Sequence, residues 1–436
     1  MKNITKEELS RDALRFLKLS KYEEIHEKLV LNLSSFAPRI ETIRVDSGLG
    51  RIAAEDVKSE IEIPSRDVTA MDGYAVRFSD LKGASLSTPV YLSVKGSIFV
   101  EHGLKLPVLL SGEAYYVATG SPLPKGSDTV VRVEEAVQVG TEGIEVKRVI
   151  PKGKDVAVKG EDIEKGEIVV RKGKLLTPID VALLIGVGKK YFRAYRVPNV
   201  GLLSIGNELK EFDPTDSKTT EGTTINNYLN LLFGFLLQLD SNPVSLGICG
   251  DDQREIRSRI KQGLKQCDMI LTISGSSVGR HDNVLGALQG IQGSETLFHG
   301  ARVVPIKPCG VVTVHQKPIV IIPGHAVSSL LTFFTIALHV LNVVSGLPLG
   351  SRKVMIGAEA SKDIVNERSI DALCLVKLDG DGRGNYKAMP LDWGSNLVSN
   401  LSHADGFVWL ARKQKIPKGS SAPVQLFTGI GITRAS

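Results

Sequence analysis

The segment 268–282, DMILTISGSSVGRHD, places the strongest constraint on how this chain can fold. Its residues 269–273 form a short apolar run with β-branched members, which is typical of a buried parallel strand. Small residues follow at once in 274–279, and they let backbone N–H groups approach an anion or another ligand closely. Asp282 then adds a carboxylate beside the loop. Open α/β sheets bind ligands at this end of their strands, although a short Gly/Ser stretch is also common in ordinary strand-to-helix turns.

The same order of strand, loop and helix recurs through the middle of the chain. Strand patterns occupy residues 200–205, 244–249 and 319–322, and helical patterns occupy residues 226–239, 255–266 and 325–346. Strands that alternate with helices predict a parallel, doubly wound sheet. We therefore expect an α/β domain at residues 197–346.

The flanking sequence has a different character. At 436 residues the chain is too long for one typical domain, and length alone predicts about three. Short apolar runs broken by glycine and proline up to about residue 150 predict a small β-rich unit. The same kind of pattern returns after residue 346 and predicts a separate small β-barrel or sandwich.

Composition limits the class of protein. Hydrophobic residues make up 42% of the chain and charged residues 23%, the ordinary balance of a soluble globular protein. The net charge of +6 does not come from a basic patch, because lysine and arginine are scattered among acidic residues. The densest basic run, residues 412–418, is typical of a solvated turn. We therefore expect no nucleic-acid partner.

The cysteines and the N-terminus indicate a cytoplasmic protein. Cys249, Cys267, Cys309 and Cys374 lie far apart and have no C-x-x-C spacing, which argues against a structural zinc site and for a reducing compartment. Residues 1–16 are charged throughout and have no apolar core, so they do not form a secretory signal.

One segment, residues 325–346, is nearly free of charge and long enough to span a membrane. It contains several serine, threonine, histidine and asparagine residues, and it follows a strand pattern and a tight turn at residues 318–324. We therefore interpret it as a buried helix of the α/β domain and expect no membrane association.

Acidic residues follow three of the predicted strands. Glu208 follows the first, Asp251 and Asp252 follow the second, and Asp282 follows the third. Parallel strands end at one edge of a sheet, so these acids should lie close together. Clustered carboxylates repel each other unless a cation neutralises them, and oxygen ligands without cysteine or paired histidine favour Mg²⁺ bridged to a phosphate. Spacing alone equally allows each acid to cap the following helix.

Other polar residues each allow two interpretations. Lys307 is either a surface residue or a cation that faces the bound anion. Ser277 and Ser328 lack the sequence context of a nucleophile elbow, so we predict no nucleophilic serine. Asp72 and Thr119 taken by themselves are typical turn residues.

Taken together, these segments resemble the molybdopterin molybdenumtransferase family, the MoeA proteins and the E domain of gephyrin. The resemblance covers nearly the whole chain after about residue 25 and rests on eight motifs in the order of the family. These are TAMDGYA at 69–75, ATGSPLP at 118–124, GEDI at 160–163, LSIGNEL at 203–209, GICGDD at 247–252, SVGRHD at 277–282, IKP at 306–308 and PGHAVS at 323–328.

The resemblance implies a multidomain α/β protein of four parts that forms a homodimer. It implies a discontinuous N-terminal domain at residues 1–64 and 151–196, with a β-rich domain at residues 65–150 inserted in it. The α/β molybdopterin-binding domain at 197–346 and a C-terminal β-barrel domain at 347–436 would follow.

The resemblance also implies insertion of molybdate, or tungstate, into adenylylated molybdopterin with Mg²⁺ and release of AMP. The functional positions of the family fall on Asp72, Thr119, Asp162, Glu208, Asp251, Asp282 and Lys307. Of these, Glu208, Asp251 and Asp282 would hold the metal. Pterin and oxyanion would contact Ser274, Gly275, Ser276, Ser277, Gly279, Pro323, Gly324, Ser328 and Ser395. Contact with the molybdopterin adenylyltransferase is a further implied partnership.

Some positions depart from the family pattern where pterin and oxyanion would bind. The usual Pro-Gly-Asn-Pro-Val-Ser carries His325 and Ala326 here, and Cys309 stands in the usual Lys-Pro-Gly-Lys-Pro. A basic residue usual four positions before Lys307 is Val303, with Arg302 adjacent. The altered loop at 323–328 favours a rival interpretation, a non-catalytic molybdopterin-binding or scaffold paralogue of the same fold, whereas the retained acids favour the enzyme. The related adenylyltransferase is a third interpretation, but its fold resembles only the α/β domain.

Overall fold

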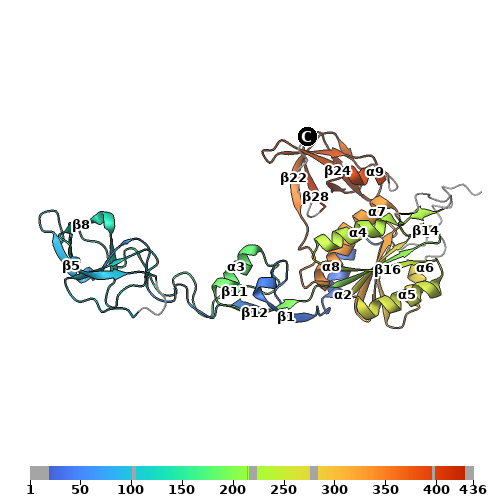
Figure 1. Ribbon diagram of the computed structural model, residues 1–436. Helices are drawn as coiled ribbons and strands as arrows, with labels where there is room; N and C mark the ends of the chain where they lie inside the picture. Colours follow the sequence, from blue (N-terminus) through green and yellow to red (C-terminus); the bar gives the residue numbers. More distant parts are fainter. Residues whose placement is uncertain are drawn as a thin grey trace, which may run out of the picture. The chain divides into compact units, whose positions relative to one another are not determined.

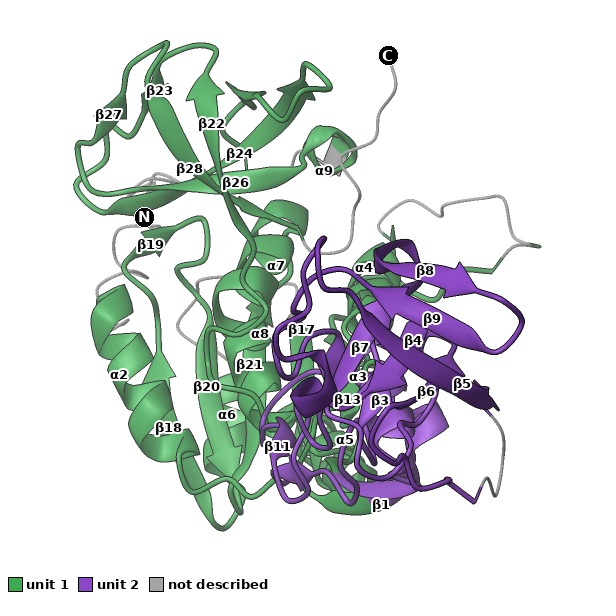
Figure 2. Ribbon diagram, turned by 90° about the vertical axis from the view of Figure 1, so that its left-hand side faces the viewer, with its two compact units in different colours: residues 1–41, 50–54, 194–436 green, residues 42–49, 55–193 purple. Residues whose placement is uncertain are grey.

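The computed structural model describes residues 19–100, 105–213, 215, 223–274, 283–394 and 398–427, with only the backbone of residues 274 and 398. The chain forms two compact units, which Figure 2 shows in different colours. Residues 1–41, 50–54 and 194–436 form the first unit, and residues 42–49 and 55–193 form the second. The sheets of the two units confirm the predicted multidomain α/β fold class.

The α/β domain is built on a six-stranded sheet of order β16-β13-β17-β21-β20-β18. Four strands are parallel, as predicted: β13 (Asn199–Ile205), β16 (Asn242–Cys249), β17 (Met269–Ser274) and β21 (Lys317–Pro323). The other two, β18 (Ser294–His299) and β20 (Gly310–Val314), extend the sheet in antiparallel fashion.

The antiparallel edge arises from a hairpin that the sequence pattern did not indicate. A two-residue turn, His315 and Gln316, joins β20 to β21, and both residues have positive φ, at 48° and 66°. Asn-Gly or another glycine pair usually marks such a turn. The histidine and glutamine in this position gave no turn signal.

Hydrophobic residues alternate between the two faces of the sheet. In β17, Met269 and Leu271 belong to the core on one face, whereas Ile270 belongs to the core on the other. This period of two follows from the pleat of a strand, and it explains why the central strands read as nearly continuous apolar runs.

Helices cover both faces of the sheet. The first core includes buried residues of α2 (Tyr22–Leu33), α4 (Asn227–Gln238) and the long apolar helix. The second core includes buried residues of α5 (Gln253–Gln266) and α6 (Asn283–Gln289), which lie together in Figure 1. This arrangement is the doubly wound architecture expected from the alternation of strands and helices.

The long apolar helix, residues 326–344, meets the length and composition of a membrane span, but 94% of it is buried inside the domain. It consists of α7 (Ala326–Thr332), a π-helical turn η4 (Phe333–Ala337) and α8 (Leu338–Val344). A π-turn disturbs the regular i to i−4 bonding. The Tyr22 hydroxyl of α2 donates a hydrogen bond to the Thr335 carbonyl in this turn at 3.1 Å. The segment is therefore a core helix, as predicted.

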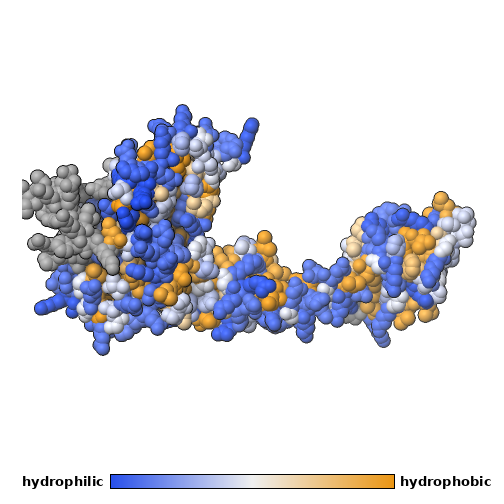
Figure 3. All heavy atoms as spheres, turned by 180° about the vertical axis from the view of Figure 1, so that it is seen from behind, coloured by the Kyte–Doolittle hydropathy of each residue, from blue (hydrophilic) through white to orange (hydrophobic). Residues whose placement is uncertain are grey.

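The second unit contains a six-stranded sheet of order β7-β4-β6-β5-β9-β8. Its strands are β4 (Gly73–Val76), β5 (Val90–Ile98), β6 (Glu113–Val117), β7 (Thr129–Arg132), β8 (Ala136–Val139) and β9 (Gly143–Val146). Figure 3 shows hydrophobic residues on the surface of this β-rich domain. Val108 and Leu110 are exposed here, at 60% and 59%.

Short elements complete this unit and the chain segments around it. The strands are β1 (Ile40–Arg44), β2 (Val57–Lys58), β3 (Val68–Thr69), β10 (Val156–Ala157), β11 (Ile168–Val170) and β12 (Tyr191–Tyr195). The helical turns are η1 (Val45–Ser47), η2 (Phe78–Leu81) and η3 (Val133–Glu135). Helix α3 (Pro178–Gly186) starts with proline, as predicted, and Thr177 and Asp180 form its capping box.

The last part of the chain forms a closed five-stranded β-barrel. Strands β24 (Asp371–Gly380), β25 (Tyr386–Pro390), β22 (Met355–Ala360), β28 (Ser421–Leu426) and β26 (Gly406–Leu410) pair in this order, and β26 pairs again with β24. Strand β19 (Val303–Val304) adds to β24. The remaining elements are β14 (Leu209–Lys210), β15 (Thr224–Ile225), β23 (Ile364–Val365), β27 (Lys415–Ile416) and α9 (Val398–His403). The predicted C-terminal barrel is therefore present.

Candidate functional site

The carboxyl edge of the parallel strands brings the predicted loops together. In the register of the sheet, Ile205 lies beside both Cys249 and Ser274, and Ser274 lies beside Pro323. The loops that follow these residues therefore start from neighbouring positions on one edge, where open α/β sheets bind ligands. The sequence had predicted this convergence.

The two acids after β16 have different environments. The Asp252 carboxylate accepts hydrogen bonds from the backbone N–H groups of Arg254 and Glu255 at 2.9 and 3.0 Å, and it caps α5. Asp251 does not cap the helix. It pairs instead with Asn207 of the neighbouring loop. The Asn207 backbone N–H donates to the Asp251 carboxylate at 3.4 Å, and the Asp251 backbone N–H donates to the Asn207 side-chain oxygen at 3.3 Å. Capping therefore applies to Asp252, whereas Asp251 is available for a ligand.

Glu208 lies in the same loop as Asn207 and folds back over Gly206. A Cβ atom added to Gly206 would lie 2.7 Å from a carboxylate oxygen of Glu208, so glycine is what lets this side chain approach the backbone. Two carboxylates, Glu208 and Asp251, thus follow adjacent strands at the carboxyl edge.

These acids suit a hard divalent cation. Mg²⁺ needs only one or two protein carboxylates when phosphate oxygens complete its coordination. Among the described residues, no group of three or more His, Cys, Asp or Glu is placed to hold a metal ion. Asp282, the third predicted ligand, lies outside them. Two carboxylates together with a phosphorylated ligand fit the chemistry of the ion.

Lys307 lies near the same edge of the sheet. Strand β20 runs antiparallel to β21, so its first residue, Gly310, pairs with Ile321 close to where β21 ends. Lys307 precedes β20 by three residues and is half-buried. Burial lowers the pKa of its ammonium group, and the nearby positive charge of Arg368 lowers that pKa further.

Arg368 is a functional candidate that sequence reasoning missed. It comes from the barrel, and its guanidinium lies 4.5 Å from the centre of the Trp393 ring, within the range of a cation–π contact. The family usually has a second basic residue four positions before Lys307, and in this sequence that position is Val303, with Arg302 adjacent. Val303 is fully buried in β19 and Arg302 is exposed. Only the tertiary structure brings Arg368 near Lys307.

A cavity of about 210 Å³ lies beside Arg368. Its lining combines apolar residues with Arg368 and comprises Val304, Pro305, Val327, Arg368, Leu373, Leu375, Leu391, Asp392, Trp393 and Gly394. Ser395, predicted to face this cleft, follows Gly394 and lies outside the described residues.

The loop at the end of β21 contains the altered family motif. His325 is exposed at the N-cap of α7 and makes no side-chain cap bond, whereas Ala326 at the first helical position is fully buried. Ser328 is 2% exposed, so its side chain lies inside the helix packing. Among the predicted residues of this loop, Pro323 is buried and Gly324 is partly exposed.

In the second unit, Asp72 and Thr119 lie in direct contact. One oxygen of Asp72 accepts both the backbone N–H and the hydroxyl of Thr119, at 2.6 and 2.7 Å. These two bonds, led by the backbone N–H, lower the pKa of the exposed Asp72 carboxyl. Gly120 follows with φ of 81°, which lets the chain turn away directly after Thr119.

Asp162 is exposed and lies in a turn of its own. Its backbone N–H donates to the Ile63 carbonyl at 3.0 Å, which ties the GEDI motif to the segment before β3. No hydrogen bond joins it to Asp72 or Thr119 among the residues that the structure describes.

Part of the predicted glycine-rich loop lies outside the described residues. This applies to Gly275, Ser276, Ser277, Gly279 and Asp282, and to the side chain of Ser274. The end of β17 at Ser274 fixes where this loop begins.

Comparisons with known proteins agree with this architecture. Residues 19–188 match a model described as the MoeA N-terminal region (domain I and II), and residues 201–342 match a probable molybdopterin binding domain. The chain is 30% identical over 313 residues to the molybdopterin molybdenumtransferase of Haemophilus influenzae, covering 71% of this chain and 74% of that protein. It is 29% identical over 329 residues to a putative molybdopterin biosynthesis protein of Methanocaldococcus jannaschii, covering 74% and 77%.

A solved structure extends the match to nearly the whole chain. The molybdopterin biosynthesis MoeA protein from Pyrococcus horikosii superposes with a TM-score of 0.80 at 29% identity, covering 95% of this chain and all of that one. The two family models end at residue 342, whereas this structure also covers the C-terminal barrel. This chain therefore belongs to the molybdopterin molybdenumtransferase (MoeA) family.

Proposed function

We propose that this protein is a molybdenum cofactor biosynthesis enzyme that inserts molybdate or tungstate into adenylylated molybdopterin and releases AMP in a Mg²⁺-dependent step. The observation that carries the proposal is the arrangement of charge at the carboxyl edge of the sheet. Glu208 and Asp251 follow adjacent strands there, and the cationic pair of Lys307 and Arg368 lies near the same edge.

The two kinds of charge suit the two parts of the reaction. When bound, Mg²⁺ would neutralise phosphate oxygens of the substrate, and Glu208, Asp251 and Asp282 would hold it. The backbone N–H groups of residues 274–279 would receive the diphosphate. The phosphoanhydride bond to AMP would then be positioned for cleavage beside the metal site.

Lys307 and Arg368 would draw in the oxyanion. No salt bridge joins either side chain to a carboxylate among the described residues, so both positive charges remain available for an anion. The neighbouring cavity offers Trp393, Val327 and Pro305 as an apolar wall for the pterin. Pro323, Gly324, Ser328 and Ser395 would shape the same part of the site.

Asp72 and Thr119 would act from the N-terminal half of a partner protomer and orient the pterin, and Asp162 would be a further functional position. Val108 and Leu110 of the β-rich domain are exposed apolar residues that such a homodimer would cover. The domain boundaries given by the resemblance, and contact with the adenylyltransferase, belong to the same proposal.

The experiment that tests the proposal incubates the protein with adenylylated molybdopterin, Mg²⁺ and each oxyanion, and measures AMP. Release that requires both Mg²⁺ and an oxyanion supports the enzyme. Substrate binding without AMP release supports the scaffold paralogue, which the altered residues His325 and Ala326 favour.

A further inference from the structure

A second cavity lies at the opposite edge of the α/β sheet, where the parallel strands begin. Pro198 precedes β13, Asp268 precedes β17 and Lys317 is the first residue of β21. The cavity measures about 190 Å³ and is lined by Phe36, Ala37, Arg39, Arg196, Pro198, Asp268, His315, Gln316, Lys317 and Val344. The candidate catalytic loops follow the other ends of the same strands, so this cavity is distinct from that site.

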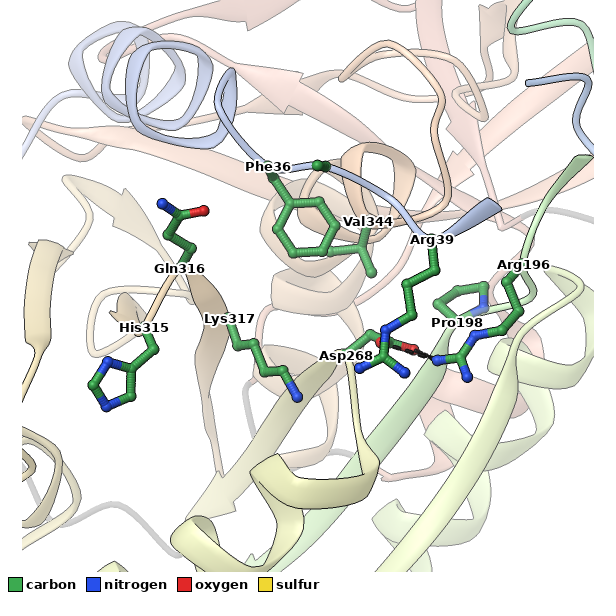
Figure 4. A pocket seen from close by; sticks show the side chains of 10 residues that line it. Phe36, Arg39, Arg196, Pro198, Asp268, His315, Gln316, Lys317 and Val344 are labelled. Carbon is green, nitrogen blue, oxygen red and sulfur yellow. Dashed lines mark hydrogen bonds and ion pairs between the residues drawn. The ribbon is translucent and has the colours of Figure 1, made fainter. Parts of the chain in front are cut away.

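Positive charge dominates the cavity. Arg39, Arg196 and Lys317 line it together with one carboxylate, Asp268, and Figure 4 shows their charged groups gathered on one side. Asp268 neutralises one of the three cations. An excess of two positive charges remains and favours a ligand with two negative charges.

The single carboxylate is already hydrogen-bonded inside the protein. Both Asp268 oxygens accept from one terminal nitrogen of Arg196, at 3.1 and 2.9 Å, and one also accepts the Asn199 backbone N–H at 2.9 Å. The side chain of Asp268 is 11% exposed. Because its oxygens are engaged inside the protein, Asp268 does not satisfy the remaining donors of the cavity.

Two arginine groups have donors without a hydrogen-bond partner in the protein. Arg196 Nε is buried and has no hydrogen-bond partner, which is costly for a charged group. The Arg39 guanidinium makes no hydrogen bond within the described chain, its Nε lies 3.8 Å from an Asp268 oxygen, and the side chain is 58% exposed. A phosphate or carboxylate group beside the two guanidinium groups would be attracted by both positive charges, because guanidinium groups bind such anions well.

Lys317 supplies a third, better fixed cation. Its ammonium group donates to two carbonyls at the end of α5, those of Leu264 and Cys267. Burial lowers the pKa of this ammonium group, and Asp268 partly opposes that effect. An anion in the cavity would favour the charged form further.

Part of the lining is apolar and comprises Phe36, Val344 and Pro198. In Figure 4 the Phe36 ring and Val344 lie together, whereas Pro198 lies beside Arg39 and Arg196. The cavity volume of about 190 Å³ is below that of typical drug-like pockets, which favours a small ligand.

We propose that this pocket binds a small organic dianion, a phosphate monoester whose carbon body rests on Phe36. The phosphate would contact Arg39, Arg196 and Lys317, and the ring or short chain would cover the apolar wall. Small dicarboxylates share the charge but lack the tetrahedral set of oxygens that three separate cations would engage. The site would therefore favour the phosphate ester over the dicarboxylate.

Calorimetric titration of the full-length protein with phenyl phosphate, inorganic phosphate and succinate at constant ionic strength tests the proposal. We expect phenyl phosphate to bind best. Arg39→Gln should weaken it about tenfold, because it removes one charge-assisted contact. Arg44→Gln is the matched control, since Arg44 is an exposed arginine of β1 outside the pocket, and it should leave binding within about twofold. Phe36→Leu should weaken phenyl phosphate but not inorganic phosphate.

A second comparison separates this pocket from the candidate catalytic site, which also attracts anions. Lys307→Gln should leave phenyl phosphate binding unchanged if the ligand occupies the pocket of Arg39. Loss of binding in Lys307→Gln with full binding in Arg39→Gln would overturn the proposal, because the ligand would then sit at the catalytic edge. No binding by the unaltered protein up to about 10 mM phenyl phosphate, or better binding of succinate, would overturn it as well.

Discussion

Thr119 binds one carboxylate oxygen of Asp72 twice, through its backbone N–H at 2.6 Å and its hydroxyl at 2.7 Å. Both residues are exposed, and they belong to motifs 47 positions apart in the chain. The two hydrogen bonds hold the carboxylate in one orientation at a low cost in conformational entropy, because the backbone donor has no side-chain freedom to lose. An exposed carboxylate fixed in this way is suited to receive a polar group of a ligand.

The first prediction concerns this pair. Thr119→Val removes the hydroxyl donor and keeps the backbone donor, so Asp72 should become less well oriented. We expect kcat/KM for AMP release to fall about tenfold, with little change in melting temperature because the pair is exposed. Thr119→Ser retains the hydroxyl and should restore most of the activity. Equal activity of the valine and serine variants would show that orientation of Asp72 does not matter.

The second prediction uses two adjacent acids with different partners. Asp251→Ala should lower Mg²⁺-dependent AMP release about 100-fold or more while the fold stays intact, because a hard ligand is lost. Asp252→Ala removes the cap of α5 and should cost about 1 kcal/mol of stability while Mg²⁺ dependence is kept. We expect Asp282→Ala to lower Mg²⁺-dependent AMP release in the same way as Asp251→Ala.

Melting curves and Mg²⁺ titrations of all three variants decide between a metal site and helix caps. Relief of carboxylate repulsion could also raise the melting temperature of Asp251→Ala in the absence of metal. If Asp251→Ala were fully active, the metal-site assignment would be wrong.

The third prediction addresses the altered loop. Ala326 occupies the first position of α7, where proline is well tolerated and would fix the turn. His325→Asn with Ala326→Pro should lower the KM for molybdate about two- to fivefold with little change in kcat. A rise in kcat at constant KM would place the role of the loop in the transition state instead.

The fourth prediction is a pH dependence of stability that comes from His339. This histidine is 6% exposed, its Nδ1 has no partner, and burial, with smaller effects of His26 and Lys353, lowers its pKa to about 4. In the unfolded chain this imidazole takes up a proton near pH 6.5, whereas in the folded protein it stays neutral at that pH. The free energy of unfolding is therefore at its full value above about pH 6.5, and it decreases by about 3 kcal/mol in total as the pH falls to 4.

Urea denaturation between pH 4 and pH 7 measures this effect. His339→Leu should flatten the loss of stability on acidification, whereas His403→Leu, a change at an exposed histidine of α9, should not. An unchanged slope in His339→Leu would rule out His339 as the source.

The fifth prediction is the oligomeric state. We expect a homodimer at micromolar concentration, because the proposed site needs Asp72 and Thr119 of a partner protomer. Light scattering after size exclusion measures the mass directly. Val108→Asp with Leu110→Asp should weaken the dimer if these exposed residues lie in the contact, and the matched change Leu86→Asp tests another exposed position, at 86%. A monomeric unaltered protein would contradict the shared site.

The sequence by itself determined the local features of this protein. Apolar runs such as residues 269–273 encode strands, the glycine and acid after each run encode the loops, and the apolar pattern of residues 326–344 encodes a core helix. The periodicity of hydrophobic residues depends only on a few neighbouring residues, so it can be recognised without knowing the rest of the chain. For that reason the α/β domain, the barrel and the convergence of the loops could all be predicted.

Only the tertiary structure decided which side chains meet. Asp251 and Asp252 are the same residue type at adjacent positions, so the sequence does not distinguish them. The loop geometry makes Asp252 a helix cap and places Asp251 beside Asn207. Arg368 belongs to the barrel, and it lies near Lys307 because the barrel is next to the α/β domain in the folded chain. The physical reason is that such contacts depend on packing between distant segments, which no local pattern encodes.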